Sequence, residues 1–357
     1  MRLEVFGVAL LCTAAIAGGT PGAARSTASA DVAELRSEPA TLSSRSLLLG
    51  LATAGKRLVA VGDRGHILLS DDAGRTWTQT GSPTQALLTG VCFSDAQHGI
   101  AVGHDEIILI SDDAGRTWKR THFAPQAQQP LLDVWCGAGG RAIAVGAYGV
   151  YMVSGDYGAS WEERKLEVTG TGTAAAGTKS GAGGAGGADA AKGAASSGED
   201  ITGGYHLNAI AADSSSRLYV AAEAGHLYRS DDGGNTWKAL SSPYEGSLFG
   251  VLPLQGGALL TYGLRGNLFR SADSGATWQR ISTGTEAMLD GATSFDAAGV
   301  AVVGLSGVIL LSRDGGSTFS LLQQDDRKGL AAVREAQQGT LATVGEAGVK
   351  LIREAHP

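Results

Sequence analysis

An eight-residue motif, Ser-x-Asp-x-Gly-x-Thr-Trp, recurs in six near-copies along this chain of 357 residues. The copies begin at Ser70, Ser111, Ser154, Ser230, Ser271 and Ser312, and the sixth ends in Phe319 instead of tryptophan. Successive copies start 41, 43, 76, 41 and 41 residues apart. A fixed period of about 40 residues is the signature of a repeat architecture, in which each repeat packs against its neighbours. The motif therefore constrains the fold more than it constrains the function.

Each repeat contains short apolar runs that are typical of β-strands. In the second repeat, residues 88–93, 99–103 and 107–110 form three such runs, and residues 118–120 begin an alternating outer strand after the motif. Short strands rich in Val, Ile and Leu and bounded by Gly and Asp, four to a repeat, describe a propeller blade. We therefore predict an all-β fold, a seven-bladed β-propeller of four-stranded antiparallel blades.

Seven repeats can be counted, and the last one is incomplete. The blades are predicted near residues 46–80, 87–121, 130–165, 205–240, 247–281, 288–322 and 329–353, within a propeller that spans residues 31–357. The seventh repeat lacks an outer strand, while residues 31–39 precede the first inner strand and are left over. We predict that this N-terminal strand completes the last blade and closes the ring, which would leave no open sheet edge.

Two segments fall outside the blade pattern. Residues 167–204 are rich in Gly, Ala, Ser and Thr and offer few large apolar side chains, so they cannot offset the entropy of ordering. This tract is predicted to be a disordered insertion between the third and fourth blades. Residues 1–30 hold Arg2, an apolar run over 5–17 and small residues that fit an A-x-A cleavage site. They predict a signal peptide with a disordered leader, and hence a periplasmic or secreted protein after cleavage.

Two cysteines, Cys92 and Cys136, remain after the leader, which contains Cys12. Both lie on predicted innermost strands of neighbouring repeats, but one position out of phase, so their side chains should point to opposite faces of their strands. Although two cysteines of an exported chain can pair, this offset favours two buried, reduced thiols over a disulfide.

The net charge argues against one class of partner. The chain has 28 basic and 35 acidic side chains and a formal net charge of −7. A nucleic-acid-binding protein is expected to carry a basic stripe, and the sequence has none. We expect no nucleic acid among the partners.

The repeated motif is predicted to be structural. Its aspartates can accept hydrogen bonds from turn amides, its glycines allow a positive φ, and its aromatic residues can pack between blades. The residues concerned are Asp72, Asp113, Asp156, Asp232, Asp273 and Asp314, with Trp77, Trp118, Trp161, Trp237 and Trp278. Each turn offers one or two carboxylates, without the spaced oxygen ligands of a calcium loop. We therefore expect no metal and no cofactor.

The motif is identified as the Asp-box, or BNR, repeat. The run Val59-Ala60-Val61-Gly62 with Gly65-His66-Ile67, just before the first copy, resembles the blade pattern of the photosystem II stability/assembly factor family. The resemblance implies a seven-bladed propeller that is exported across a membrane and is not an enzyme. It also implies that the partner is a membrane-protein complex or its assembly intermediate. We expect the propeller to act as a monomer.

The loops opposite the Asp-boxes are the predicted binding surface, because binding residues concentrate on loops held by a rigid scaffold. Arg64 and Arg265 occupy equivalent turns in the first and fifth repeats, and both match the Gly-x-Arg-Gly turn for which the assembly factors are known. The other five repeats depart from this turn. The candidate partner-binding residues are Arg64, Arg265, Asp63, His104, Tyr148, Lys119 and Arg120.

Two other functions remain open from the sequence: recognition of a glycan or small ligand over the propeller axis, and hydrolysis of a glycoside, because Asp-boxes also mark sialidases. Sialidases carry a Phe/Tyr-Arg-Ile-Pro stretch before the first Asp-box, which this sequence lacks. Arg64 and Arg265 could join Arg334 in an arginine triad, but Arg334 lies in an inner strand. Other glycosidases need two facing carboxylates, which Glu106, Glu223 and Glu346 could supply only by chance. No catalytic residue is assigned.

Overall fold

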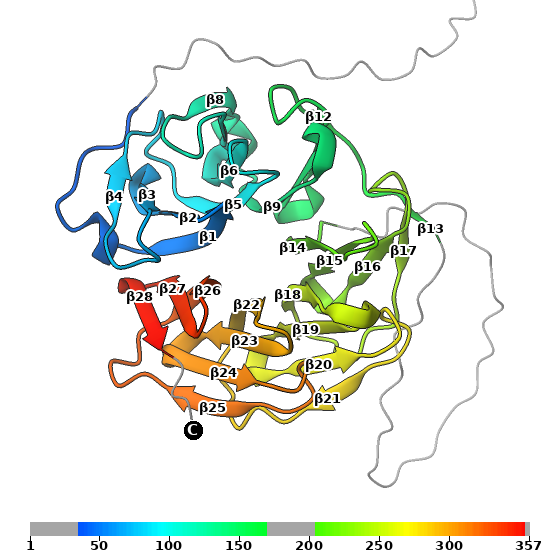
Figure 1. The fold of residues 1–357 in the computed structure, drawn as a ribbon. Coiled ribbons are helices and arrows are strands. Elements are labelled where there is room, and N and C mark those ends of the chain that lie inside the picture. Colours follow the sequence, from blue (N-terminus) through cyan, green and yellow to red (C-terminus); the bar gives the residue numbers. More distant parts are fainter. Residues whose placement is uncertain (1–34, 170–203, 354–357) are drawn as a thin grey trace, which may run out of the picture.

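The computed structural model describes residues 35–169 and 204–353. Seven sheets follow one another around a ring, and each contains an antiparallel meander whose first strand lies nearest the centre (Figure 1). The predicted seven-bladed propeller is therefore confirmed. The predicted signal peptide, residues 31–34 and most of the Gly/Ala-rich insertion lie outside the described residues.

The first three blades each contain four strands. Blade 1 comprises β1 (Leu48–Ala54), β2 (Arg57–Gly62), β3 (Ile67–Ser70) and β4 (Thr78–Thr80). Blade 2 comprises β5 (Leu88–Phe93), β6 (Gly99–Gly103), β7 (Ile108–Ser111) and β8 (Lys119–His122). Blade 3 comprises β9 (Leu131–Cys136), β10 (Ala142–Gly146), β11 (Tyr151–Ser154) and β12 (Glu162–Glu163).

The remaining blades differ in strand number. Blade 4 comprises β14 (Leu207–Ala212), β15 (Leu218–Ala222), β16 (Leu227–Ser230) and β17 (Trp237–Ala239). A fifth strand, β13 (Val168–Thr169), pairs parallel with β17 and uses residues that the sequence had placed in the disordered insertion. Blade 5 comprises β18 (Leu248–Pro253), β19 (Leu259–Gly263), β20 (Leu268–Ser271) and β21 (Gln279–Ile281). Blade 6 comprises β22 (Leu289–Phe295), β23 (Gly299–Gly304), β24 (Val308–Ser312) and β25 (Ser320–Gln323). Within the described residues, blade 7 has three strands, β26 (Leu330–Gln337), β27 (Thr340–Gly345) and β28 (Gly348–Arg353).

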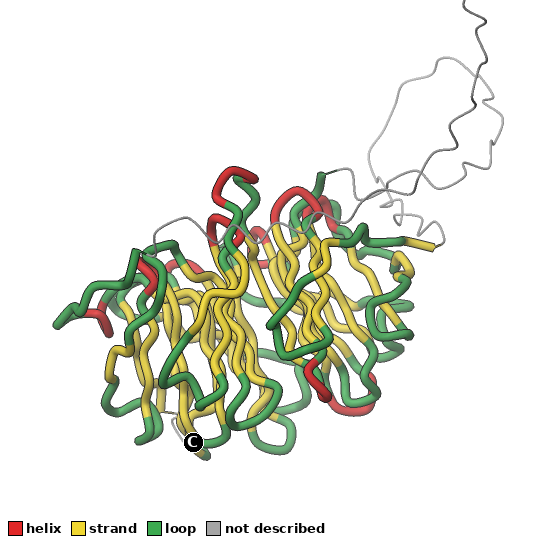
Figure 2. The backbone as a smooth tube through the Cα atoms, turned by 90° about the horizontal axis from the view of Figure 1, so that it is seen from above, coloured by secondary structure: helices red, strands yellow, loops and turns green. Residues whose placement is uncertain are grey.

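Ten short 3-10 turns complete the described structure, and most of them lie at one end of the strands (Figure 2). Six connect the second and third strands of a blade: η2 (Asp63–Gly65), η3 (His104–Glu106), η6 (Ala147–Gly149), η7 (Glu223–Gly225), η9 (Leu264–Gly266) and η10 (Leu305–Gly307). The others are η1 (Ser43–Arg45), η4 (Pro125–Ala127), η5 (Ala138–Gly140) and η8 (Gln255–Gly257). Within the described ranges, no helix has the length and apolar character needed to span a bilayer.

The hydrophobic core is divided among the seven seams between neighbouring blades. Each apolar cluster joins residues of two adjacent blades, and the last one joins blade 7 to blade 1 through Ala342, Val344 and Leu48. Successive residues of a strand serve different seams, because their side chains alternate between the two faces of the sheet. In β6, Ala101 packs toward blade 1, whereas Ile100 packs toward blade 3.

The prediction that residues 31–39 complete blade 7 is wrong for the part of this segment that the structure describes. Residues 35–39 form no strand, and they lie against blade 1. The backbone N–H of Ser37 donates to the Ser82 carbonyl oxygen at 3.0 Å. The Gln79 side chain donates to the Glu38 carbonyl oxygen and accepts from the Ala40 N–H, each at 2.9 Å. This side-chain amide binds the segment in place of a strand, so the ring closes by packing of blade 7 on blade 1.

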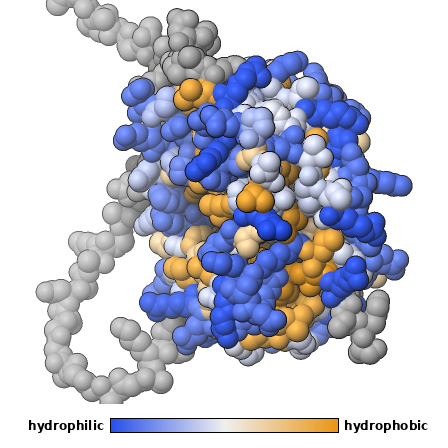
Figure 3. Space-filling model, turned by 90° about the vertical axis from the view of Figure 1, so that its left-hand side faces the viewer, coloured by the Kyte–Doolittle hydropathy of each residue, from blue (hydrophilic) through white to orange (hydrophobic). Residues whose placement is uncertain are grey.

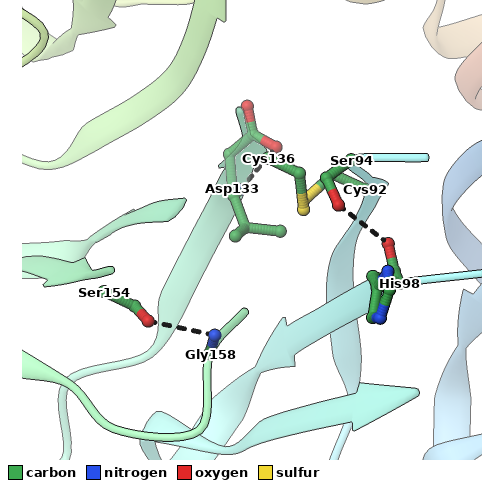
Figure 4. The surroundings of a disulfide bond; sticks show 8 residues. Cys92, Ser94, His98, Asp133, Cys136, Ser154 and Gly158 are labelled. Carbon is green, nitrogen blue, oxygen red and sulfur yellow. Dashed lines mark hydrogen bonds between the residues drawn. A yellow bond between two sulfur atoms is a disulfide. The ribbon is translucent and has the colours of Figure 1, made fainter. Parts of the chain in front are cut away.

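The prediction of two reduced thiols is also wrong. Cys92 and Cys136 form a disulfide between β5 and β9, with their Cα atoms 5.7 Å apart (Figure 4). Cys92 is paired with Ile100, the second residue of β6, whereas Cys136 is paired with Ala142, the first residue of β10. The two cysteines are therefore one position out of phase, and their side chains lie on opposite faces of their blades. Propeller blades pack face against face, so opposite faces of successive blades are the two that meet. The offset of one position therefore brings the sulfur atoms together.

Each Asp-box is a turn held by one serine, one aspartate and one threonine. In blade 1, Ser70 Oγ accepts from the Gly74 N–H at 2.8 Å and donates to Asp72 Oδ1 at 2.8 Å. Asp72 also accepts from the N–H and the hydroxyl of Thr76, at 2.9 and 2.6 Å. Gly74 has a φ of 82°, which few other residues adopt. The other five Asp-boxes repeat this network, and Ser160 replaces threonine in blade 3.

These bonds predict a loss of stability in acid. The threonine of each motif lowers the pKa of Asp72 and of Asp273 to about 2, first through the hydrogen bond from its hydroxyl and then through the one from its backbone N–H. The pKa of an aspartate in an unfolded chain is about 3.9. Because the folded pKa is lower, this stabilisation is complete above about pH 4 and is lost as the pH falls toward about 2. An Asp273→Asn variant should be less stable than the unsubstituted protein in urea at neutral pH, and the difference should vanish near pH 2. An equal difference at both pH values would contradict the assignment.

Candidate partner-binding face

The face that carries the turns between second and third strands, here called the turn face, is closely packed. The middle residue of six of these turns has a positive φ of 52–60°: Arg64, Asp105, Tyr148, Ala224, Arg265 and Ser306. The next residue is glycine in five of the six, and an added Cβ at Gly65 or Gly266 would collide with a carbonyl oxygen of the following loop between blades. The turns and the loops between blades therefore form one packed surface.

The two arginines that the sequence singled out lie on this face but on separate blades. Arg64 is exposed, and its Nε lies 3.6 Å from Asp63 Oδ2 in the same turn. Arg265 is exposed in the equivalent turn of blade 5. Blades 6 and 7 lie between them on the shorter way around the ring. The structure therefore does not unite them in one arginine patch.

Arg265 instead belongs to a groove of about 1150 Å³ on blade 5. The groove is lined by Tyr244, Arg265, Asn267, Phe269, Arg280 and Glu286. Its aromatic wall is formed by the rings of Tyr244 and Phe269, whose centroids are 6.2 Å apart. Both arginines are exposed and outnumber the single carboxylate. An apolar wall beside two guanidinium groups suits a peptide segment that combines apolar and acidic groups.

Tyr148 joins a second group of side chains at the seam of blades 3 and 4. It is 59% exposed, and its ring meets the His206 ring edge to face, with centroids 4.9 Å apart. Glu223 accepts from the His206 backbone N–H at 3.0 Å, and its other oxygen lies 3.4 Å from His206 Nδ1. Beside this pair the Tyr205 ring lies against the His226 ring, tilted by 45°, with ring centroids 4.5 Å apart.

Sequence reasoning missed Tyr205 and His206, because they follow the Gly/Ala-rich tract and belong to no repeated motif. The position of His206 directly before the inner strand of blade 4 was the available signal. The residue directly before the inner strand accepts, through its backbone carbonyl oxygen, a hydrogen bond from the first N–H of the turn. Leu47 and Leu87 do so in other blades, and His206 accepts from the Glu223 N–H in blade 4.

The candidates on blade 2 divide between the two faces of the ring. His104 is exposed on the turn face, and the Arg120 guanidinium lies over the Phe123 ring at 4.9 Å. Lys119 reaches Asp112 of the Asp-box at 3.5 Å, so it does not join the turn face. The buried Glu106, which stands where other blades have glycine, pairs with His122 at 3.1 Å.

Known proteins share the repeat sequence and the fold of this chain. The sequence profile of a family described as photosynthesis system II assembly factor YCF48 matches residues 69–185. This chain is a propeller that resembles the YCF48 assembly factors. No curated protein sequence matches it.

Two YCF48 structures show the same fold. One, with a bound D1 peptide, is 15% identical and matches 87% of this chain and 94% of its own, with a TM-score of 0.64. The other, from Cyanidioschyzon merolae, is 16% identical and matches 88% and 96%, with a TM-score of 0.63. The WD40 propeller of Doa1, at 10% identity, matches 90% and 96% with a TM-score of 0.61. The fold is thus shared beyond the YCF48 proteins, and the resemblance to them rests on the repeat sequence.

The inner strands of this YCF48-like propeller carry ionisable groups that sequence reasoning did not assign. Asp133 accepts from the N–H groups of Val134 and Ile210 at 2.8 and 2.9 Å, which links blade 3 to blade 4. Burial raises the pKa of Asp133 and of Asp290 to about 6. Arg334 donates to the Ala292 carbonyl oxygen at 3.3 Å, on the neighbouring blade.

These contacts do not assemble the catalytic sets weighed from the sequence. Arg334 lies in inner strand β26, whereas Arg64 and Arg265 lie on turns, so the three do not converge as a triad. Glu106 lies on blade 2 and Glu223 on blade 4, and each is paired with a histidine of its own blade, so the two carboxylates do not face each other. Among the residues that the structure describes, no three His, Cys, Asp or Glu side chains are grouped to hold a metal ion.

Proposed function

We propose that this protein is an exported, non-enzymatic propeller that binds a protein partner through its turn face and assists the assembly or stability of a membrane complex. The groove on blade 5 is the observation that carries this proposal, because it combines exposed Arg265 and Arg280 with an aromatic wall. The resemblance to YCF48 supports it, since one YCF48 structure holds a D1 peptide.

Export is supported by the disulfide between Cys92 and Cys136. Disulfides form and persist in oxidising compartments such as the periplasm, and they are rare in the cytosol. The leader over residues 1–30 supplies the predicted route. Mass spectrometry of the protein from its own cells, with thiols blocked before lysis, tests this: an intact disulfide and a missing leader are expected.

Affinity capture from detergent-solubilised membranes of the source cells tests the partner. The unsubstituted propeller should recover a membrane protein, and an Arg265→Glu/Arg280→Glu variant should recover at least about tenfold less of it, because both charge-assisted contacts are reversed. Arg64→Glu is the matched control, since Arg64 occupies the equivalent turn away from the groove. Equal recovery by all three proteins, or a positive glycan-array or glycosidase screen without any captured protein, would contradict the proposal.

A further inference from the structure

The inner strands of three blades carry a polar side chain at the same position. Thr89, Asn208 and Asp290 each follow the first leucine of their strand, and each is the residue that bulges out of the ladder with the second strand. At this position the other four inner strands have apolar residues, which are Leu49, Leu132, Phe249 and Ala331. All seven positions belong to the strands nearest the axis of the ring (Figure 1).

Two of the three polar side chains link their blade to the next one. Thr89 Oγ1 donates to the Leu131 carbonyl oxygen at 2.8 Å, from blade 2 to blade 3. Asn208 Nδ2 donates to the Leu248 carbonyl oxygen at 2.9 Å, from blade 4 to blade 5. In both cases the acceptor is the first residue of the next inner strand, so the position is that of a hydrogen-bond donor between blades.

The corresponding link from blade 6 to blade 7 would join Asp290 to the Leu330 carbonyl oxygen. Leu330 is the first residue of β26 and is buried in the seam between these blades. An ionised carboxylate has no proton to donate, whereas a protonated carboxyl group has one O–H donor. The Asp290 side chain is half-buried beside the axis, and this burial raises its pKa to about 6.

The ionisable groups around Asp290 do not compensate its charge. The elements that pack closely against β22 are β18, β19, β23, β26 and η9, and of these β18 and β23 have no ionisable side chain. β19 supplies Tyr262, whose pKa is raised by burial and then by the charge of Asp290, so the phenol is neutral. β26 supplies Glu335 and Arg334, which donates to two backbone carbonyl oxygens, and η9 supplies the exposed Arg265.

We propose that Asp290 is a proton-dependent link between blades 6 and 7, in which the protonated carboxyl group donates to the Leu330 carbonyl oxygen and the ionised one weakens the seam. Blade 7 closes the ring. Its other seam, with blade 1, packs through Leu48, Ala342 and Val344, and apolar side chains gather on that side of the molecule (Figure 3). The seam with blade 6 would therefore respond to pH, independently of the proposed function.

Asp290→Asn tests the proton dependence, because an amide donates at every pH, as that of Asn208 does. The folded pKa of Asp290 lies above the value of about 3.9 in an unfolded chain, so the charge penalty is complete above about pH 6 and disappears toward about pH 4. Asp290→Asn should lower the unfolding equilibrium constant by about tenfold or more at pH 8, and the two proteins should converge near pH 4. Urea unfolding measures both. No difference at pH 8, or an equal difference at both pH values, would overturn the proposal.

Two further measurements test the bond itself and its position. By NMR, a side-chain amide proton of the asparagine introduced by Asp290→Asn should exchange slowly with solvent, and fast exchange would overturn the link to Leu330. Asn208→Asp is the matched variant, because it places a carboxyl group at the same position of blade 4. It should be less stable than the unsubstituted protein at pH 8 and should recover near pH 4. A loss that does not depend on pH would contradict a proton-dependent link at this position.

Discussion

Replacing Trp237 by alanine is expected to reduce the free energy of unfolding by about 3–5 kcal/mol. Trp237 belongs to the Asp-box of blade 4 and is fully buried in the seam with blade 3. Its ring meets the Tyr151 ring edge to face, with centroids 6.0 Å apart, and the Tyr151 hydroxyl donates to the Gly234 carbonyl oxygen at 2.7 Å. Truncation would remove the largest fully buried side chain of this seam and leave a cavity. Urea unfolding followed by circular dichroism measures the loss.

Trp278→Ala is the matched control, because it removes the same side chain from the same place in another Asp-box. Trp278 is half-buried, and its indole N–H lies near the surface. We expect a clearly smaller loss of stability there, since less apolar surface leaves water on folding. Equal losses for the two variants would contradict the view that packing in the seam, rather than the turn itself, determines how much each tryptophan contributes to the free energy of unfolding.

Removing the disulfide is expected to cost about 2–4 kcal/mol of stability. The bond joins residues 44 positions apart and links the inner strands of two blades, so it limits the freedom of the unfolded chain. A Cys92→Ala/Cys136→Ala variant should unfold at a lower urea concentration than the oxidised protein.

A reducing agent provides the control for this prediction. Reduction should lower the stability of the unsubstituted protein toward that of the double variant and should leave the double variant unchanged. An unfolding midpoint that does not respond to the reducing agent would show that the disulfide does not form or does not stabilise the fold.

The period of the Asp-boxes made the architecture predictable. The motif is both repeated and local, because its serine, aspartate and threonine bond within one turn, as Ser70, Asp72 and Thr76 do. Its spacing therefore indicates blade number without any knowledge of long-range contacts. The gap of 76 residues likewise revealed the tract between blades 3 and 4.

Two of the structural errors concern contacts between blades. The Cys92–Cys136 bond follows from face-to-face packing of successive sheets, which strand periodicity alone does not describe. Residues 35–39 have the length of a missing strand, but the Gln79 side chain binds them to blade 1. Local pattern indicates which residues form strands, and it does not indicate which neighbour completes a sheet.

The candidate site was predictable only in part. The turn face followed from the repeat, and Arg265 from its Gly-x-Arg-Gly turn. The groove around it also requires Tyr244 from the preceding loop, Phe269 from β20 and Arg280 from β21. None of these three residues belongs to a shared motif, so the repeat gave no signal for them.

Site-specific photo-crosslinking in the source cells tests the central claim most directly. A photoreactive residue at Glu286 would lie in the blade 5 groove, and one at Ala276 would lie in the Asp-box of the same blade, at its opposite end. Both side chains are exposed. The account predicts a crosslink to a membrane protein from Glu286 that is lost with Arg265→Glu, and none from Ala276. Crosslinks from Ala276 alone, or from neither position, would contradict binding of a membrane partner through the turn face.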